Sequence, residues 1–321
     1  MKTSRFIRTR VVLSLALLIA AAFLVSESSR TVGQNYRPAA ELQALLNMRF
    51  YENNGGFLVE NVQVVFPPAG SPRGMLVVSK LSGEEVASMP LRLTRYSEFP
   101  AFANFVPDGD PGNLRIGQPG DYVMTIKIGG DEVTRMPFSL KEERNNDPFN
   151  PKTQFIREGP WRDWAYIASP VDEPGGNITF NFWMSLREFP AGGSRPMASL
   201  HLMLGAQQIG TTRSNIVPSY VDWQFFSKEL VSAPNVPSPH YLTMADLKKD
   251  GDYTMVLKVN GQPVKSYKLQ VKGGQLIRPE QSRLGYEPHI NFVSPRFVDI
   301  SEGTSSRYKM RDMYWVRKIG R

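Results

Sequence analysis

The side chains that most often carry out chemistry are sparse in this chain. It has no cysteine and only three histidines in 321 residues, which excludes thiol catalysis, disulfides and cysteine-ligated metal centres. His201, His240 and His289 share no spacing typical of a zinc site, and His201 falls in a strand-like run, where a structural role is expected. The Asp-rich segment 108–113 lacks the acidic ligands of a calcium loop and is interpreted as a turn. We therefore expect no metal and no cofactor.

Enzyme motifs give the same expectation. The chain has no GxSxG nucleophile motif, no P-loop and no glycine-rich dinucleotide loop after a strand. Two carboxylates that meet in space could still form a glycosidase-type site, because such a pair has no fixed spacing in sequence. The prediction is a protein that is not an enzyme, with a hydrolase of unrecognised carboxylate site as a remaining alternative.

The tryptophans are concentrated in one part of the chain. Four of the five lie between positions 161 and 223, and the segment before them has none. Exposed aromatic rings stack on sugars or anchor protein partners, so Trp161, Trp164 and Trp223 are candidate ligand or partner contacts. The alternative is that these rings fill the core. Trp183, in the run TFNFWMSL, fits either interpretation.

The last 15 residues form a second candidate contact region. They carry six basic residues and one acid, interleaved with aromatic rings. This composition suits an anionic membrane surface, an acidic polymer or a partner protein, and a solvated end is the alternative. The candidate contacts are Arg307, Lys309, Arg311, Tyr314, Trp315, Arg317 and Lys318.

The N-terminus predicts export. Four basic residues in positions 1–10 precede the uncharged run Val11–Val25, which is typical of a secretory signal peptide and short for a membrane span. Residues 1–28 are predicted to be this signal, with an uncleaved anchor as the alternative. The net charge of +8 then resides in the two ends, so the body is close to neutral and nucleic acid is not an expected partner.

An eleven-residue motif occurs twice, 131 positions apart. Gly120–Gly130 reads GDYVMTIKIGG and Gly251–Gly261 reads GDYTMVLKVNG. Apolar residues alternate with polar ones from Tyr122 and from Tyr253, which predicts half-buried strands. Gly-Gly or Asn-Gly follows, which favours a tight hairpin turn. The two copies are therefore predicted to be a structural repeat. Its defining residues are Gly120, Tyr122 and Gly130 in the first copy and Gly251, Tyr253 and Gly261 in the second.

Further strand-like runs precede each copy, separated by turn-forming residues. They are Phe57–Phe66, Met75–Lys80, Val86–Thr94 and about 101–106 before the first copy, and Trp164–Ala168, Ile178–Leu186, Ser199–Leu204 and about 221–230 before the second. A Gly-x-Tyr at the start of a late strand, followed by a terminal hairpin, resembles the tyrosine corner of immunoglobulin-like sandwiches. The resemblance implies an all-β fold with two tandem sandwich domains.

The predicted organisation follows the chain in six parts. They are a signal or anchor (1–28), a lead-in with a short amphipathic helix near Pro38–Asn53 (29–56), sandwich domain 1 (57–142), a linker (143–160), sandwich domain 2 (161–273) and an extended segment with the basic tail (274–321). We expect an exported, periplasmic or extracellular protein that acts in binding, adhesion or assembly at the cell envelope. The expected partner is an envelope protein or polysaccharide, and a carbohydrate-binding module is the first alternative.

Overall fold

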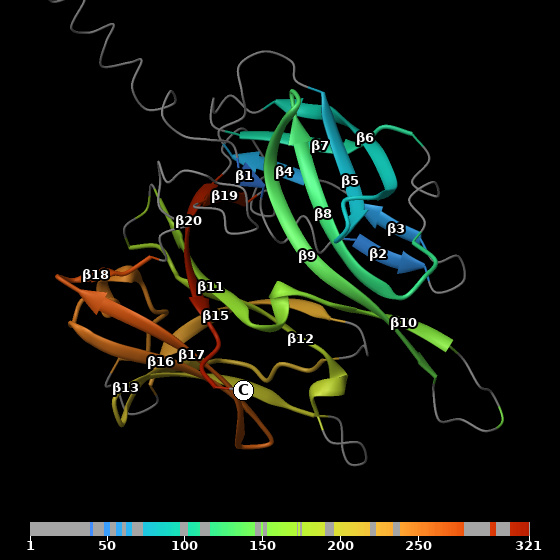
Figure 1. Cartoon of the computed structure of the whole chain (residues 1–321). Coiled ribbons are helices and arrows are strands. Elements are labelled where there is room, and N and C mark those ends of the chain that lie inside the picture. Colours follow the sequence, from blue (N-terminus) through green and yellow to red (C-terminus); the bar gives the residue numbers. More distant parts are fainter. Residues whose placement is uncertain are drawn as a thin grey trace, which may run out of the picture. The chain divides into compact units, whose positions relative to one another are not determined.

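The computed structural model is nearly all β, with two sheets that form a sandwich or near-barrel (Figure 1). The structure describes residues 39–40, 48–51, 56–59, 62–65, 73–96, 102–109, 116–144, 149, 153–171, 173, 175–189, 196–218, 223–233, 238–278, 296–299 and 309–320. Every pair of neighbouring strands in the named sheets is antiparallel.

The first sheet has eight strands in the order β1-β4-β7-β6-β5-β8-β9-β10. Their bounds are β1 (Ala39–Ala40), β4 (Val62–Val65), β5 (Gly74–Lys80), β6 (Glu85–Tyr96), β7 (Phe102–Pro107), β8 (Gly120–Ile128), β9 (Asp131–Arg144) and β10 (Thr153–Glu158). Strands β2 (Met48–Tyr51) and β3 (Gly56–Val59) pair separately.

The second sheet has ten strands in the order β18-β17-β16-β13-β14-β15-β12-β11-β20-β19. Their bounds are β11 (Trp164–Pro170), β12 (Thr179–Met184), β13 (Ala198–Leu204), β14 (Gln207–Thr212), β15 (Gln224–Ser232), β16 (Gly251–Val259), β17 (Gln262–Lys272), β18 (Gln275–Leu276), β19 (Arg296–Asp299) and β20 (Lys309–Arg317). Three 3-10 turns accompany it: η2 (Pro160–Arg162), η3 (Leu186–Glu188) and η4 (Met244–Leu247).

The two sheets repeat one connectivity. Taken in chain order, strands β1 and β4–β10 of the first sheet occupy the same positions as strands β11–β18 of the second. In each, three hairpin-connected strands are followed by a fourth that returns beside the first of them, which is a Greek-key arrangement. These are β5-β6-β7 with β8, and β13-β14-β15 with β16.

The eleven-residue motif forms the same hairpin in both sheets, so the predicted strands at Tyr122 and Tyr253 are confirmed. Both hairpins shift register at equivalent positions, after Ile126 in β8 and after Leu257 in β16. Their turns have positive φ at both central residues, 62° and 95° in the first copy and 48° and 82° in the second. Such angles are typical of the primed turns that match strand twist, and they explain the Gly-Gly and Asn-Gly pairs.

The two motif tyrosines are buried and make the same hydrogen bond. The hydroxyl of Tyr122 donates to the carbonyl of Gln118 over 2.7 Å, and that of Tyr253 donates to the carbonyl of Lys249 over 3.0 Å. Each bond links the tyrosine to the residue four positions before it, and so fixes the segment that precedes the strand to the beginning of the strand. The two copies therefore share a local architecture as well as a sequence.

The C-terminal strand β20 belongs to the second sheet. It pairs with β11 from Trp164↔Arg317 to Pro170↔Arg311. Beyond its end, Lys318 forms a bridge with Tyr267 of β17, and the N–H of Ile319 donates to the carbonyl of Ser266 over 2.7 Å. The chain end thus joins β20 to β17 and nearly closes the sheet on itself.

Two clusters of buried apolar side chains form the core. One draws on β8, β9, β11 and β20, and so includes residues of both sheets, among them Tyr122, Trp161 and Trp315. The other lies within the second sheet around Phe180, Leu257 and their neighbours. The packing of the first cluster continues across the predicted domain boundary at 143–160, and the division into two domains stays a prediction.

Three expectations from the sequence need correction or limits. The helix expected near Pro38–Asn53 is wrong where the structure describes it, since β1 and β2 occupy positions 39–40 and 48–51. The second half of the expected linker is strand β10, paired with β9. The signal segment 1–28 lies outside the described residues. Within the described residues, no helix has the length and apolar character needed to cross a membrane.

Candidate functional site

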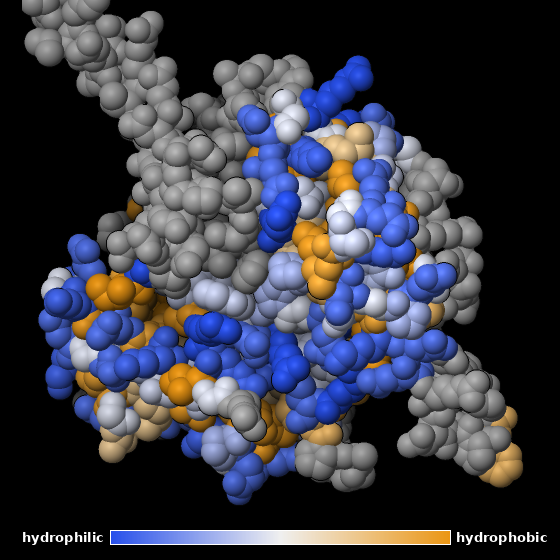
Figure 2. Space-filling view, in the orientation of Figure 1, coloured by the Kyte–Doolittle hydropathy of each residue, from blue (hydrophilic) through white to orange (hydrophobic). Residues whose placement is uncertain are grey.

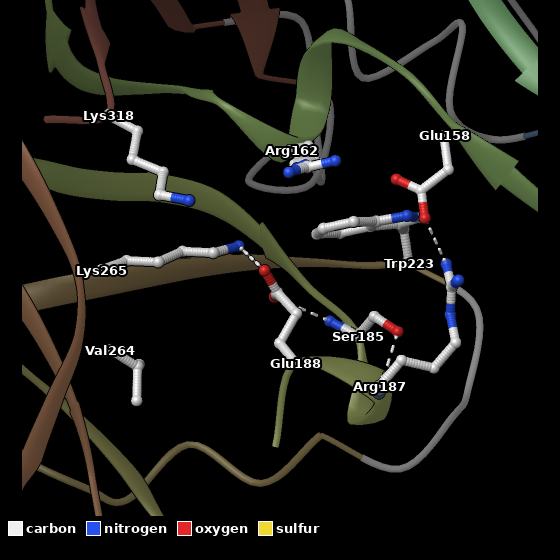
Figure 3. Close-up of a pocket in the computed structure, with 9 residues that line it drawn as sticks. All are labelled: Glu158, Arg162, Ser185, Arg187, Glu188, Trp223, Val264, Lys265 and Lys318. Carbon is white, nitrogen blue, oxygen red and sulfur yellow. Dashed lines mark hydrogen bonds and ion pairs between the residues drawn. The ribbon is translucent and has the colours of Figure 1, made fainter. Parts of the chain in front are cut away.

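A cavity of about 330 Å³ lies at one end of the second sheet (Figure 3). It is built from segments far apart in sequence: the end of β10, the turn η2, the turn η3 with its cap, the residue before β15, the start of β17 and the residue after β20. We call it the Lys265 pocket. Its lining residues are Glu158, Arg162, Ser185, Arg187, Glu188, Trp223, Val264, Lys265 and Lys318.

The wall formed by η3 is fixed by a reciprocal capping box. The backbone N–H of Arg187 donates to the Ser185 hydroxyl oxygen over 3.2 Å, and the N–H of Ser185 donates to Glu188 Oε2 over 3.3 Å. This pairing satisfies two backbone donors at the start of the turn. It also orients the Glu188 carboxylate toward the pocket (Figure 3).

Lys265 is the buried cation of the pocket. It occupies an inward position of β17, on the same face as Tyr267, and its side chain is 3% exposed. The ammonium pairs with Glu188 Oε1, donates to the carbonyl of Trp183 over 3.3 Å and lies 4.8 Å from the centre of the Trp223 ring. Burial lowers the pKa of Lys265 and the nearby Lys318 ammonium lowers it further, whereas Glu188 opposes both effects.

Burial raises the pKa of Tyr267, which follows Lys265 on the same face of β17. The buried Tyr267 phenol has a pKa raised well above its ordinary value, first by burial and then by the negative charges of Glu188 and Asp163. It therefore stays neutral at any physiological pH.

A second ion pair lines the opposite side. Arg187 contacts Glu158 Oε1 over 3.0 Å and Glu143 over 3.4 Å. The other carboxylate oxygen, Glu158 Oε2, is buried with no hydrogen-bond partner among the described residues, and the same holds for the indole N–H of Trp223. Buried polar atoms without partners are uncommon, and each calls for an explanation.

Two more cations face the pocket. Among the described residues, no carboxylate pairs with the side chains of Arg162 or Lys318. Lys318 is held in place by its backbone, because its N–H donates to the carbonyl of Asp163 over 2.7 Å. The lining residues therefore comprise four cations and two carboxylates, and this excess of positive charge favours an anionic ligand.

The described lining of the pocket places no nucleophile beside a base. Figure 3 shows the Ser185 hydroxyl on the side of Arg187, whereas the Lys265 ammonium points toward Glu188. Serine and lysine thus do not form a nucleophile–base pair. Each of the two carboxylates already holds a cation. Among the lining cations, Arg162 and Lys318 have no carboxylate partner in the described part of the chain.

The three candidate tryptophans lie in different environments. Trp161 is fully buried in η2 and contributes to the core. Trp223 is half-buried and lines the Lys265 pocket. Trp164 is half-buried, packs edge-on against Trp315 and lines a second cavity of about 400 Å³, which we call the Trp164 pocket. The structure does not place the three rings in one row.

The candidate residues of the C-terminal tail are divided by strand β20. Trp315 and Arg311 are buried, and Tyr314 is half-buried under the guanidinium of Arg278 at 4.3 Å. Arg317 lines the Trp164 pocket and Lys318 lines the Lys265 pocket. Arg307 lies outside the described residues, and for Lys309 the structure describes only the backbone pairing with Asp299.

Sequence reasoning missed most of the pocket. Glu158, Arg162, Ser185, Arg187, Glu188 and Lys265 were not candidates, although three of them carried a local pattern. Ser185 and Glu188 have the S-x-x-E spacing of a capping box. Lys265 stands at an inward position of an alternating strand, where an apolar residue is usual.

The histidines and acids do not converge elsewhere in the described residues. No group of three or more His, Asp or Glu there is arranged to hold a metal ion. His201 contacts the side chains of Ser199 and Gln208 on β13 and β14. His240 contacts Asp246 Oδ1 over 3.0 Å.

The described surface has no single dominant apolar area on the face shown in Figure 2, where apolar patches are interspersed among hydrophilic residues. Comparison of the chain with protein-family models, with curated proteins and with solved structures gives no match.

Proposed function

We propose that the chain is an exported, non-enzymatic protein that binds a component of the cell envelope. The observation that carries the binding role is the Lys265 pocket, in which the carboxylates are engaged in ion pairs while Arg162 and Lys318 face the cavity unpaired within the described part of the chain. Such a site can hold a negatively charged ligand without acting on it.

We further propose that the two sheets are tandem immunoglobulin-like units. Their shared Greek-key order supports this proposal, as do the equivalent hydrogen bonds of Tyr122 and Tyr253. Two such units in series are a common scaffold for extracellular binding, because loops and pockets at the sheet ends vary without changing the core.

Export is proposed on the N-terminal sequence alone. The basic first ten residues and the apolar run Val11–Val25 support a signal peptide, and an uncleaved anchor is the alternative. Cell fractionation with the intact N-terminal mass of the exported protein tests this. An intact mass that corresponds to a chain beginning near residue 29 supports cleavage of the signal peptide. A full-length mass in the membrane fraction supports the uncleaved anchor, and recovery of the protein in the cytoplasmic fraction refutes export.

Carbohydrate binding through tryptophan is the second candidate, and the Trp164 pocket favours it. The half-buried ring of Trp164 lies in this cavity with Asp121, Asp163 and Arg317, which are hydrogen-bonding groups of the kind that contact sugar hydroxyls. Tyr122 and Phe138, stacked at 5.6 Å, complete an aromatic wall.

The tail contributes to binding only in part under this proposal. Strand β20 buries Arg311 and Trp315, which leaves Arg317 and Lys318 as the described basic residues available to an anionic partner. Removing residues 307–321 would remove a strand of the sheet, so point substitutions are the cleaner test.

The binding role is tested by retention of the mature chain, residues 29–321, on immobilised envelope polysaccharide and envelope protein fractions. We expect salt-sensitive retention that is reduced in the Arg162→Met/Lys318→Met double variant. Lys272→Met, on the exposed end of β17, is the matched control for loss of a positive charge. Equal retention of the wild type and the double variant would show that the Lys265 pocket is not the binding site.

A further inference from the structure

Three polar side chains are hydrogen-bonded in a row on the face of the second sheet opposite its core, outside both pockets. Ser199 Oγ lies 2.9 Å from His201 Nε2, and His201 Nδ1 lies 3.2 Å from Gln208 Oε1. All three side chains are half-buried, whereas Leu200 and Leu202, which alternate with them along β13, are buried in the core. The row therefore lies on a face that is partly open to solvent.

The geometry fixes which nitrogen of His201 carries the proton. A carboxamide oxygen can only accept a hydrogen bond, so the contact with Gln208 Oε1 requires the proton on His201 Nδ1. His201 Nε2 then has a free lone pair, and the Ser199 hydroxyl donates to it. The distance of 2.9 Å is within the reach of a general base, so His201 can take the Ser199 proton while the serine oxygen attacks an electrophile.

A β-bulge brings Gln208 to the face that carries His201. The pairing of β13 with β14 shifts after Leu202, so that Met203 pairs with Gln208 and not with Ile209. Side chains alternate along a regular strand, and without the shift Gln208 would lie on the core face with Leu202. Bulges re-aim side chains in this way and are frequent beside active sites. The bulge therefore completes the row by placing a hydrogen-bond acceptor behind the imidazole.

The first sheet shows that the shared strand order does not require a serine and a histidine at these places. Strand β5 takes the place of β13 in that order, and each of the two strands shifts register against the next strand along the chain. Counted from that shift, the places of Ser199 and His201 are taken by Met75 and Val77. A sheet of the same order therefore forms with a thioether and an isopropyl group there, so the fold alone does not account for the hydroxyl and the imidazole.

A positive charge lies beside the serine. Lys258 of β16 pairs directly with Ser199, which puts the two side chains on one face with their Cβ atoms about 4.5–5.5 Å apart. The Lys258 ammonium can therefore stabilise negative charge that develops on a carbonyl oxygen under attack. Strand β13 lies between β14 and β16, so the backbone N–H groups around Ser199 serve the sheet. This arrangement suits attack on an ester that is already reactive, with one transfer per chain.

We propose that Ser199 is an acyl-acceptor site, at which the chain takes up an acyl group from a reactive carboxylic ester. Ser199 Oγ forms a bond to the acyl carbon while its proton passes to His201 Nε2. The bond between the acyl carbon and the alcohol oxygen of the ester then breaks, and the proton passes from His201 to that oxygen. The products are an acylated Ser199 and the free alcohol. Gln208 is a positioning residue that holds the imidazole in the reactive tautomer. The inference goes beyond the proposed binding function, which uses none of these residues.

The test is peptide mass spectrometry of the mature chain, residues 29–321, after timed exposure to p-nitrophenyl acetate. Ser266 is the internal control, because it is half-buried on the same face two strands away from His201. We expect Ser199 to be acetylated about tenfold faster than Ser266 or more, and His201→Gln to slow Ser199 about a hundredfold, at the low end of what a general base contributes. Gln208→Met should slow it about fivefold through loss of one hydrogen bond. Gln208→Glu keeps an oxygen acceptor and should retain the wild-type rate.

Two results would overturn the proposal. One is equal acetylation of Ser199 and Ser266, and the other is a rate at Ser199 that His201→Gln leaves unchanged, because the hydrogen bonds would then have a structural role only. If His201→Gln fails to fold by its thermal transition, His201→Val, with the residue that the first sheet has at this place, replaces it. A Gln208→Glu variant as slow as Gln208→Met would refute the positioning role of Gln208. None of these outcomes bears on retention by envelope fractions, so the binding function is tested separately.

Discussion

The motif tyrosine Tyr253 allows the structural repeat to be tested quantitatively. Tyr253 lies in β16, where its ring is buried and its hydroxyl donates to the carbonyl of Lys249 over 3.0 Å. Tyr253→Phe removes only the hydrogen bond, which is expected to lower the free energy of unfolding by about 0.5–1.5 kcal/mol. Tyr253→Ala also removes the ring and leaves a cavity, with an expected loss of about 3–5 kcal/mol.

Urea denaturation followed by tryptophan fluorescence is a suitable assay. All five tryptophans lie between residues 161 and 315, so the signal reports on the second sheet and the core it contributes to. Tyr122→Phe in the first sheet removes the equivalent hydrogen bond to Gln118 and should cause a loss of similar size, monitored by far-ultraviolet circular dichroism. Tyr241→Phe is the control, because its hydroxyl contacts only the exposed Arg213 among the described side chains.

The two substitutions at Tyr253 refute the reasoning in different ways. A loss below about 0.5 kcal/mol for Tyr253→Ala is the size expected at the surface and would show that the ring does not support the core. If Tyr253→Phe is neutral while Tyr253→Ala is costly, the ring is a core residue and the hydroxyl does not fix the strand. Only a loss of unfolding free energy in both variants supports a structural role for the ring of Tyr253 together with its hydrogen bond to Lys249.

Three further predictions concern an ion pair, a turn and a histidine. Lys265→Met should lower the free energy of unfolding by about 2–3 kcal/mol in urea titrations, because it leaves Glu188 unpaired, whereas Lys268→Met breaks an exposed pair with Asp252 and should cost at most about 1 kcal/mol. Gly261→Ala should lower the free energy of unfolding by about 1–2 kcal/mol, because the backbone φ of 82° is unfavourable for alanine although an added Cβ would meet no neighbouring atom. Gly175→Ala is the control: an added Cβ also has room there and φ is not positive, so no loss is expected. The pKa of His240 is raised by its hydrogen bond to the Ser238 carbonyl and by Asp246, so its stabilising contribution is full below its ordinary pKa of 6.5 and is lost as pH rises through the folded value. The stability difference between wild type and His240→Gln should therefore shrink toward zero at alkaline pH, and a difference that grows with pH would contradict this.

The strands of the repeat could be predicted because their information is local. Alternation from Tyr122 and Tyr253, followed by Gly-Gly or Asn-Gly, specifies both the inward face and the turn. The positive φ angles at those turns are the physical reason for the residue choice. The shared strand order of the two sheets could not be read in this way, because it depends on pairings such as β4 with β7 that skip intervening strands.

The expected helix near Pro38–Asn53 is wrong at positions 39–40 and 48–51, because helical spacing is a weak indicator over a short stretch. Leu42, Leu45 and Leu46 fit one face of a helix, but the residues after them pair as strand β2 with β3 from Met48↔Val59 to Tyr51↔Gly56. Strand β3 provides the backbone hydrogen-bond partners of β2, and such tertiary pairing overrides the intrinsic helix propensity of a short segment.

The C-terminal tail shows how charge can hide a strand. In β20, the side chains of Arg311, Met313 and Trp315 alternate inward and are buried. The alternation is present in the sequence. The interpretation as a solvated or membrane-binding end followed from the many cations of the segment, one of which, Arg311, occupies an inward position. The aromatic residues of this segment serve the core first, and only its last described residues reach the pockets.

The Lys265 pocket could not be predicted from sequence because its lining comes from six separated segments. Only the fold brings the end of β10, the η3 turn and β17 together. Lys318 reaches the cavity because the chain end is fixed to Asp163 and Ser266 by backbone hydrogen bonds. The sequence predicted Trp223 and Lys318 as contact residues, but not the other residues that line the pocket.

This construction connects ligand binding to closure of the second sheet. The pocket is complete only when β20 is paired with β11 and the chain end is joined to β17, since Lys318 is otherwise absent from it. A ligand that requires Lys318 therefore binds the closed sheet and not a form in which the tail is released. By mass action, such a ligand at a concentration of 100 times its Kd stabilises the closed form by about 2.7 kcal/mol. The basic tail can then act in binding through its place in the sheet, with no need to contact a membrane surface.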